Sequence, residues 1–396
     1  MHESIDREVM LPGHGGHRRL GIVGGGQLAS MTAAAARRLG CDVLVLERYA
    51  FSPASHLAGD TTIGNWDDPD VLRAFASHVD VLTIENEFVD VDALAAVEAA
   101  GGAVFPTPAT LRLIQDKCIQ KSTLVAAGLP VPAFQPVDSV DALKAALATF
   151  GLPAVLKARR NGYDGKGNVT IRAMSEVDAA WATLGGGERG LYLEAFCPFT
   201  RELATMVTRG RDGQMVVYPI VETIQRDHIC HQVLAPAAIS GAVAARAAAM
   251  ATAAITAIDG VGSFGVEMFE TADGAVLINE LAPRVHNSGH YTIEACACSQ
   301  FENHVRAMFA WPLGSPAMIA PAAVMVNMLG SGAGSGEPRG LTEALAVPGA
   351  HVHVYGKAKS GRGRKMGHVT AVGPTIENAR ATATRAASAI TFGVSQ

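Results

Sequence analysis

The stretch between residues 19 and 47 constrains the fold of this chain more than any other. A short apolar run at residues 20–23 leads into three glycines, a helical pattern at residues 30–39 and a second apolar run at residues 42–47. This order is typical of a βαβ unit, whose two strands lie parallel in one sheet. Further strand patterns at residues 79–85 and 103–105 extend the prediction to a parallel α/β layer.

The length of the chain indicates several domains. With 396 residues, 49% of them hydrophobic and 17% charged, the chain has enough apolar residues for two or three packed units and too few charges for disorder. We predict a loose extension over residues 1–18, an α/β domain over 19–115, a second region over 116–190 and a third over 191–396. The predicted helix at residues 110–127 crosses the first of these boundaries.

Charge and cysteine usage exclude several classes of protein. The net charge is −5, and no run of basic residues predicts a nucleic-acid partner. The six cysteines lack metal or redox spacing, which is typical of a reducing cytosol. The apolar segment at residues 238–258 contains Arg246 and is read as a helix of a soluble protein, and residues 1–18 lack a secretion signal. We therefore expect a cytoplasmic protein with small-molecule ligands and no membrane or nucleic-acid partner.

The first glycine turn allows three interpretations. Gly24, Gly26 and Ala29 follow the spacing of a dinucleotide fingerprint, and Glu47 ends the next strand. A helix N-terminus preceded by glycines can also bind any other phosphate. The glycines could equally serve only a tight turn, so this motif alone leaves the function open.

A second glycine-rich loop favours nucleotide binding. Lys157 ends an apolar strand, where a lone charge is costly unless it meets a counter-charge such as a phosphate. The loop at residues 162–168 follows and could fold over a polyphosphate, although a flexible charged hairpin tip is the alternative. The spacing of a Walker A loop is absent.

A predicted hairpin at residues 264–281 places two carboxylates together. If Asp273 and Gly274 form a two-residue turn, Glu267 lies directly opposite Glu280. Two facing carboxylates repel unless they are exposed, protonated or bridged by a cation, and oxygen ligands select a hard ion such as magnesium. Strict alternation puts Asn279 on the other face, so its joint ligation with Glu280 would require a bulge.

Two polar segments could bind an anionic substrate beside this pair. The first is the irregular stretch after the hairpin, with Arg284, His286, Asn287 and His290. The second is a compact basic loop at residues 357–368. Each could also be an ordinary solvated loop, but the position of the first at a strand exit favours function.

Together these motifs resemble the N5-carboxyaminoimidazole ribonucleotide synthases, a family of ATP-grasp enzymes. The resemblance rests on Gly24 to Leu28, residues 161–167, the run from Asn279 to His290 and residues 363–368, and it spans residues 19–390. It implies a fold of the α/β and α+β classes. This fold has a Rossmann-like pre-ATP-grasp domain, a small lid domain and a C-terminal domain that includes a terminal substrate-binding subdomain.

The resemblance also implies an activity. Mg-ATP, or the manganese complex in its place, would phosphorylate bicarbonate to carboxyphosphate, which would carboxylate 5-aminoimidazole ribonucleotide in de novo purine biosynthesis. A homodimer that passes its product to N5-carboxyaminoimidazole ribonucleotide mutase is implied as well.

Site residues follow from the same resemblance. Magnesium would be bound by Glu267 and Glu280, and the catalytic residues would be Arg284, His286, Asn287 and Lys365. The ATP site would comprise Lys117, Lys157, Gly162, Tyr163, Asp164, Gly165, Lys166, Gly167, Asn168, Glu194, Ala195, Phe196, Cys197, Glu202, Gln225, Asn279 and Glu280. The ribonucleotide would contact Gly26, Gln27, Glu85, Tyr163, Arg284, His286, Asn287, Lys357, Arg364 and Lys365. Two positions depart from the family pattern, because Lys117 stands where relatives often have Arg and Gln225 where a His is expected.

Three alternatives remain at this stage. One is another ATP-grasp ligase, of the glycinamide ribonucleotide transformylase or biotin-dependent carboxylase type. The others are a nicotinamide-dependent dehydrogenase, which would leave Glu267 and Glu280 unexplained, and a non-catalytic nucleotide-binding regulator. The run from Pro283 to His290 argues against the first alternative, and the presence of Lys157, Glu267 and Glu280 argues against the last.

Overall fold

The computed structural model describes residues 17–162 and 167–393. The predicted extension therefore lies almost wholly outside the described residues. Tyr163, Asp164, Gly165 and Lys166 of the glycine-rich loop lie outside them too.

The N-terminal part is a parallel sheet covered by helices, as predicted. The strand order is β3-β2-β1-β4, and every pairing is parallel. Its strands are β1 (Arg19–Val23), β2 (Asp42–Glu47), β3 (Asp60–Ile63) and β4 (Val81–Ile84). Its helices are α1 (Gln27–Arg38), α2 (Pro69–Ala76), α3 (Val91–Ala99) and α4 (Pro108–Gln115). The sequence did not predict β3, whose four residues include no fully buried side chain.

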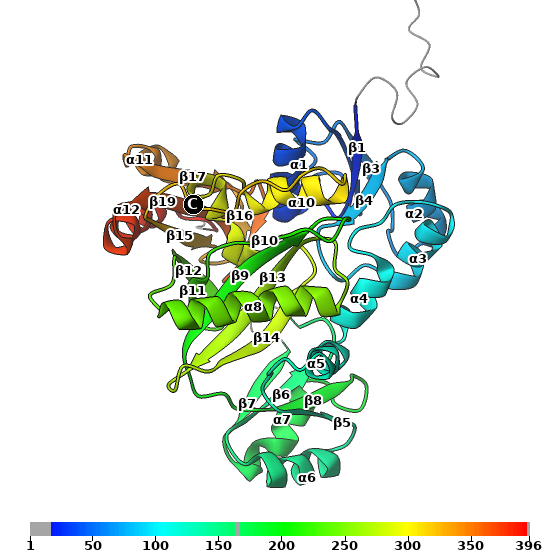
Figure 1. Cartoon of the computed structure of the whole chain (residues 1–396), viewed down its shortest axis with the longest axis vertical. Helices are drawn as coiled ribbons and strands as arrows, with labels where there is room; N and C mark the ends of the chain where they lie inside the picture. The colour runs from blue at the N-terminus through cyan, green and yellow to red at the C-terminus, as the bar shows by residue number, and fades with distance from the viewer. Residues whose placement is uncertain (1–16, 163–166, 394–396) are drawn as a thin grey trace, which may run out of the picture.

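A small antiparallel sheet forms the next unit, at the bottom of Figure 1. Its strands run in the order β5-β8-β6-β7, and α6 and α7 pack on them around one apolar cluster. The elements are α5 (Lys117–Ala126), β5 (Phe134–Val137), α6 (Val140–Phe150), β6 (Ala154–Ala158), β7 (Asn168–Ile171), the 3-10 helix Met174–Glu176, α7 (Val177–Thr183) and β8 (Leu191–Ala195).

The rest of the chain builds one nine-stranded sheet in the order β14-β13-β9-β11-β12-β15-β19-β17, with β10 also paired to β9. Its strands are β9 (Phe199–Arg209), β10 (Met215–Val217), β11 (Val221–Arg226), β12 (Ile229–Ala235), β13 (Gly262–Thr271), β14 (Val276–Ala282), β15 (Ala322–Leu329), β17 (Ala350–Val354) and β19 (Lys365–Gly373). Its pairings are antiparallel, so the acidic hairpin and the C-terminal segment belong to one continuous sheet.

Helices cover both ends of this large sheet. Figure 1 shows α8 lying across β9, β13 and β14, and α12 lying beside β15 and β19. The helices are α8 (Gly241–Ala257), α9 (Thr292–Ala295), α10 (Gln300–Met308), α11 (Leu341–Leu345) and α12 (Ile376–Ala389), with the 3-10 helix Asn287–Gly289. A separate short ladder joins β16 (Gly334–Ser335) to β18 (Lys359–Ser360).

Three predicted elements differ from the structure. The helix predicted at residues 110–127 is two helices, because Asp116 takes an extended conformation and caps α5. The strand predicted at residues 103–105 is reduced to a single bridge between Val104 and Leu82. The basic loop predicted at residues 357–368 contains β18, and β19 begins at Lys365.

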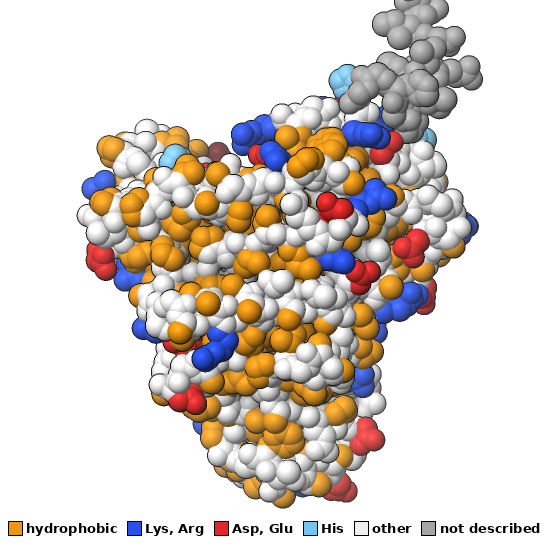
Figure 2. Space-filling model, viewed as in Figure 1, with side chains coloured by type: hydrophobic (Ala, Val, Ile, Leu, Met, Phe, Trp, Pro, Cys, Tyr) orange, Lys and Arg blue, Asp and Glu red, His pale blue; other side chains and the backbone are white. Residues whose placement is uncertain are grey.

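The alanine-rich segment near residue 250 is a helix, as predicted, and one face of α8 packs into the largest apolar cluster. Among the described residues, no helix has both the length and the apolar character needed to cross a membrane. On the face shown in Figure 2, basic and acidic side chains are scattered and form no continuous basic patch.

Candidate active site

The facing glutamates of the β13/β14 hairpin are the centre of the site. Glu267 pairs with Glu280 in the ladder, which confirms the predicted pairing of these two residues. The predicted turn is wrong, however, because Thr271 N–H donates to the carbonyl of Ala275 at 3.0 Å and leaves a three-residue loop. A bulge between Glu267 and Met268 compensates for this difference, and Asn279 is the extra residue. Asn279 and Glu280 together thus oppose Glu267.

The electrostatics of the pair fit a cation-binding site. Burial and then the charge of Glu280 raise the pKa of Glu267. Burial opposes ionisation of Glu280 also, but Lys117, whose Nζ lies 3.2 Å from Glu280 Oε2, and then Lys157 lower its pKa. Oxygen ligands of this type suit magnesium, which commonly takes one or two carboxylates together with substrate phosphates. Among the described residues, no cluster of three or more His, Cys, Asp or Glu side chains could hold a metal by itself.

A buried cluster of opposite charges lies next to this pair. Lys121 is 1% exposed, and its Nζ lies 2.7 Å from Glu194 Oε2 and donates to the Asn279 carbonyl at 3.2 Å. Lys157 pairs with the other oxygen of Glu194. Burial would raise the pKa of Glu194, but the two lysines outweigh it and lower the pKa. Glu194 thus fixes Lys157 relative to the bulge of β14.

Other residues predicted to bind ATP surround this cluster. Asn168 pairs with Lys157 in the β6/β7 ladder, and Gly167 has a φ of +93° that allows it to approach Gly162. Ala195 ends β8 and leads to Phe196 and Cys197. The side chain of Gln225 hydrogen-bonds Glu202, whose charge also contributes to the raised pKa of Glu267. The structure therefore brings the described members of this set to one region.

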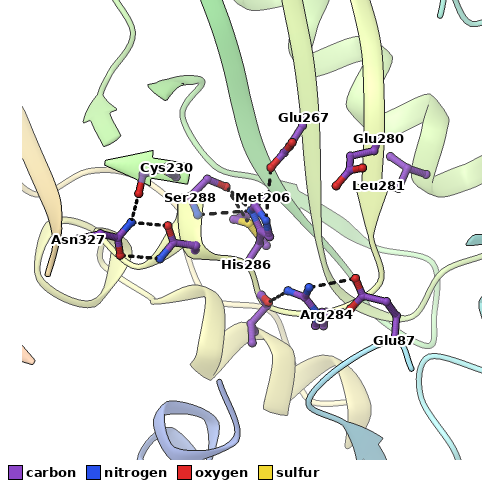
Figure 3. A network of polar contacts seen from close by, with 12 residues as sticks. Glu87, Met206, Cys230, Glu267, Glu280, Leu281, Arg284, His286, Ser288 and Asn327 are labelled. Carbon is purple, nitrogen blue, oxygen red and sulfur yellow. Dashed lines mark hydrogen bonds and ion pairs between the residues drawn. The ribbon is translucent and has the colours of Figure 1, made fainter. Parts of the chain in front are cut away.

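Arg284 forms a two-point ion pair with Glu87, a residue that the sequence analysis missed. Arg284 Nε and Nη2 donate to the two carboxylate oxygens at 2.5 and 3.1 Å. Burial alone would raise the pKa of Glu87, but the Arg284 charge and hydrogen bond lower it to about 2. Figure 3 shows this pair beside the two glutamates of the hairpin. Glu87 lies two residues after Glu85, just beyond the buried strand β4. This position after a buried strand could have identified Glu87 as a candidate site residue from the sequence.

His286 faces Glu267 as a neutral imidazole. Its Nε2 lies 3.4 Å from Glu267 Oε1, and its Nδ1 is 3.4 Å from the Ser288 N–H, which can only donate. Nδ1 therefore accepts, and the ring proton is assigned to Nε2, toward the carboxylate (Figure 3). Burial, reinforced by Arg284, lowers the pKa of His286 to about 3.

The N-terminal domain contributes Gly26, Gln27 and Glu85. A Cβ on Gly26 would lie 2.1 Å from Glu85 Oε1, so a larger residue at this position would displace the Glu85 carboxylate. Burial raises the pKa of Glu85. Glu47, which completes the dinucleotide fingerprint in the sequence, accepts the Gly25 N–H at 2.7 Å. Because an internal carboxylate occupies this glycine turn, the turn does not favour binding of a pyrophosphate.

Two C-terminal basic residues, Lys357 and Lys365, lie close enough to the site for their charges to act on its titratable groups. Burial raises the pKa of Glu267, and the charge of Lys365 offsets a small part of this rise. Burial lowers the pKa of His286, and the charge of Lys365 adds to this decrease. Burial likewise raises the pKa of Glu85, and the charge of Lys357 offsets a small part of the rise. Lys357 Nζ also donates to the Lys365 carbonyl at 2.7 Å. Arg364 is exposed, and its guanidinium donates to the Lys359 carbonyl within the loop.

Comparisons with known proteins cover almost the whole chain. Sequence models match for the ribonucleotide synthetase preATP-grasp domain at residues 17–115, the ATP-grasp domain at residues 122–301 and the phosphoribosylaminoimidazole carboxylase C-terminal domain at residues 323–382. An N5-carboxyaminoimidazole ribonucleotide synthase of Synechococcus elongatus is 42% identical over 354 residues, which are 89% of each chain. The chain belongs to the N5-carboxyaminoimidazole ribonucleotide synthase family.

Longer relatives and solved structures agree with this membership. Phosphoribosylaminoimidazole carboxylase of Schizosaccharomyces pombe is 43% identical over 89% of this chain, and the match spans 64% of that longer relative. A crystal structure of the Aspergillus clavatus synthase with ADP and 5-aminoimidazole ribonucleotide has a TM-score of 0.87 and 35% identity, covering 94% of this chain and 98% of that one. The predicted ATP-grasp fold is thereby confirmed for this family member.

Proposed function

We propose that this chain carboxylates 5-aminoimidazole ribonucleotide at its exocyclic amine, using ATP and bicarbonate, in de novo purine biosynthesis. The observation that carries the proposal is the facing pair Glu267 and Glu280, set between Lys117 and the His286 loop. The full-length similarity to synthases supports the choice of substrates.

ATP would bind between the small antiparallel sheet and the nine-stranded sheet. Lys157 and Lys117 would contact the phosphates, the backbone of residues 194–197 would hold the base, and residues 162–168 would cover the polyphosphate. Glu194 is buried with both oxygens near lysines, so its side chain orients Lys157. Glu202 and Gln225 would line the ribose side of the cleft. Bound magnesium, or manganese, would neutralise charge on the transferring phosphoryl group between Glu267, Glu280 and the amide of Asn279.

Two transfers complete the reaction. A bicarbonate oxygen attacks the γ-phosphorus, and ADP leaves with the electrons of the broken P–O bond. The amine of the ribonucleotide then attacks the carbon of carboxyphosphate, the C–O bond to phosphate breaks, and the departing phosphate takes up the proton that the amine loses. Arg284 and Lys365 would stabilise the negative charge of bicarbonate and carboxyphosphate. Neutral His286 would hold Glu267 in place.

The ribonucleotide would lie where the N-terminal domain, the loop at residues 283–290 and the basic segment meet. Gly26, Gln27 and Glu85 would contact it from one side, and Lys357, Arg364 and Lys365 would bind its phosphate. Tyr163 would complete the site from the glycine-rich loop. We further propose a cytoplasmic homodimer whose product passes to N5-carboxyaminoimidazole ribonucleotide mutase.

The decisive experiment is a substrate-omission assay. ADP release should require both bicarbonate and 5-aminoimidazole ribonucleotide, because the carboxyphosphate formed must meet its acceptor in the same site. Undiminished ADP release without the ribonucleotide would contradict the substrate assignment. Thermal stabilisation by NAD but not by Mg-ATP would instead favour the dehydrogenase alternative.

A further inference from the structure

Two buried asparagines form a reciprocal amide pair behind the proposed active site. Asn287 Nδ2 donates to Asn327 Oδ1 at 3.0 Å, and Asn327 Nδ2 donates to Asn287 Oδ1 at 2.7 Å. Asn287 is 8% exposed and Asn327 3% exposed. In Figure 3, Asn327 lies on the side of His286 away from Glu280, and dashed lines mark the hydrogen bonds of its amide. The amide of Asn287 is thus already engaged within the protein.

Asn327 is itself anchored to the large sheet. The β12/β15 register runs as far as Gln232 opposite Val326 and stops one residue before Asn327. At that point Asn327 Nδ2 also donates to the Cys230 carbonyl at 2.9 Å, so both of its amide hydrogens have partners. The side chain takes the place of a ladder hydrogen bond where the strand pairing ends.

A second buried amide holds the neighbouring residue from the other side. Gln300 is 0% exposed; its Oε1 accepts the His286 N–H at 2.9 Å, and its Nε2 donates to the His286 carbonyl at 2.8 Å. His286 and Asn287 are therefore fixed, one by its backbone and the other by its side chain. The ring of His286 is left to approach Glu267 at 3.4 Å.

We propose that Asn327 is a positioning residue for this reaction, which acts through Asn287 to hold the loop of Arg284 and His286 against the site. The inference rests on the proposed function and assigns Asn287 to positioning rather than to substrate contact. Small displacements matter in such a site, because a shift of about 1 Å can cost about 100-fold in rate. Buried amides that hydrogen-bond each other reciprocally resist such shifts.

The test is a double-mutant cycle with Asn327→Ala, Asn287→Ala and the double variant. Each single change should lower kcat/KM for the ribonucleotide about 10- to 100-fold and leave KM for ATP within about twofold. The loss of kcat/KM in the double variant should be no larger than in the more impaired single variant, because both changes remove the same amide pair. A much larger loss in Asn287→Ala than in Asn327→Ala would show that Asn287 contacts substrate itself and would overturn the proposal.

Asn303 offers a matched control for general destabilisation. It is also fully buried, and its amide bonds Tyr218 Oη at 2.8 Å and the Gly314 N–H and carbonyl at 2.7 and 3.0 Å. Asn303→Ala should lower the thermal midpoint as Asn327→Ala does, with kcat/KM unchanged. Equal losses of kcat/KM in Asn303→Ala and Asn327→Ala, or wild-type kinetics in Asn327→Ala, would refute this inference and leave the proposed function standing. A wild-type protein without ribonucleotide-dependent ADP release would refute the proposed function and the inference with it.

Discussion

One extra residue, Asn279, decides how the acidic hairpin can act. The three-residue turn shifts the register by one residue, so without the bulge Glu267 would pair with Asn279 and not with Glu280. With the bulge, the two carboxylates face each other, and the Asn279 carbonyl accepts a hydrogen bond from the buried Lys121. This pairing of two carboxylates, which with burial raises the pKa of Glu267, supports the proposed cation site.

The Glu280→Gln variant tests this explanation at the residue scale. We expect magnesium-dependent turnover to fall about 100-fold or more, because one charged ligand is lost. The free energy of unfolding should change by less than about 1 kcal/mol, since a partly exposed pair with Lys117 is lost while repulsion from Glu267 is relieved. Turnover is measured across a magnesium titration and stability by urea unfolding.

Asp273→Asn, an exposed change at the tip of the same hairpin, is the control and should retain full turnover. Wild-type magnesium dependence in Glu280→Gln would eliminate the proposed metal role.

The break between α4 and α5 lies where the chain passes from the N-terminal domain toward the small sheet. Asp116 caps α5 by accepting from Cys118 N–H at 2.9 Å and Ile119 N–H at 3.3 Å. The same carboxylate pairs with Arg159, just after β6, at 2.8 Å. Lys117 and Lys157, both proposed to contact phosphates, flank these two residues. One carboxylate therefore fixes the start of a helix and the end of a strand at the nucleotide site.

At this scale we predict that Asp116→Ala destabilises the fold by about 2–4 kcal/mol, because it removes a helix cap and leaves Arg159 without its charge partner. Asp116→Asn keeps a capping oxygen and should cost roughly 1 kcal/mol less. Urea unfolding of both variants measures the difference. Equal losses of unfolding free energy in the two variants would show that the helix cap contributes nothing. An Asp116→Ala protein as stable as the wild type would contradict the prediction outright.

At the scale of the whole molecule, one buried neutral imidazole on α10 connects the N-terminal domain to the large sheet. His304 on α10 accepts the Ser263 N–H of β13 at Nδ1, at 2.9 Å, and its Nε2 lies 3.1 Å from Thr83 Oγ1 of β4. Burial lowers the pKa of His304 to about 4 and also holds the pKa of His290 and His368 well below the usual value. The contact between the N-terminal domain and the large sheet thus depends on an uncharged ring.

These buried imidazoles predict that the folded protein loses stability in acid. Because the folded pKa of His304 lies below its unfolded value, the unfolded state binds the proton first, and stability falls as pH drops from about 6.5 toward 4. The contribution of His304 to this loss is roughly 3 kcal/mol. His304→Asn should therefore flatten the dependence of unfolding free energy on pH in this window.

Urea unfolding at several pH values measures the slope, and the same change at the exposed His78 controls for the loss of an imidazole. A slope in His304→Asn as steep as in the wild type would contradict the assignment.

The sequence by itself determined the features that depend on local pattern. The βαβ unit and the helix near residue 250 followed from periodicity. The pairing of Glu267 with Glu280 followed from an assumed two-residue turn; that turn was wrong, and an unforeseen bulge offset the error. Only the tertiary structure decided which distant groups meet. Glu87 with Arg284, Lys121 with Glu194 and Asn287 with Asn327 are separated by up to 197 residues. No local pattern specifies such partners, because the pairing of buried charges and amides is fixed by which elements pack together and by the cost of leaving a polar group unsatisfied.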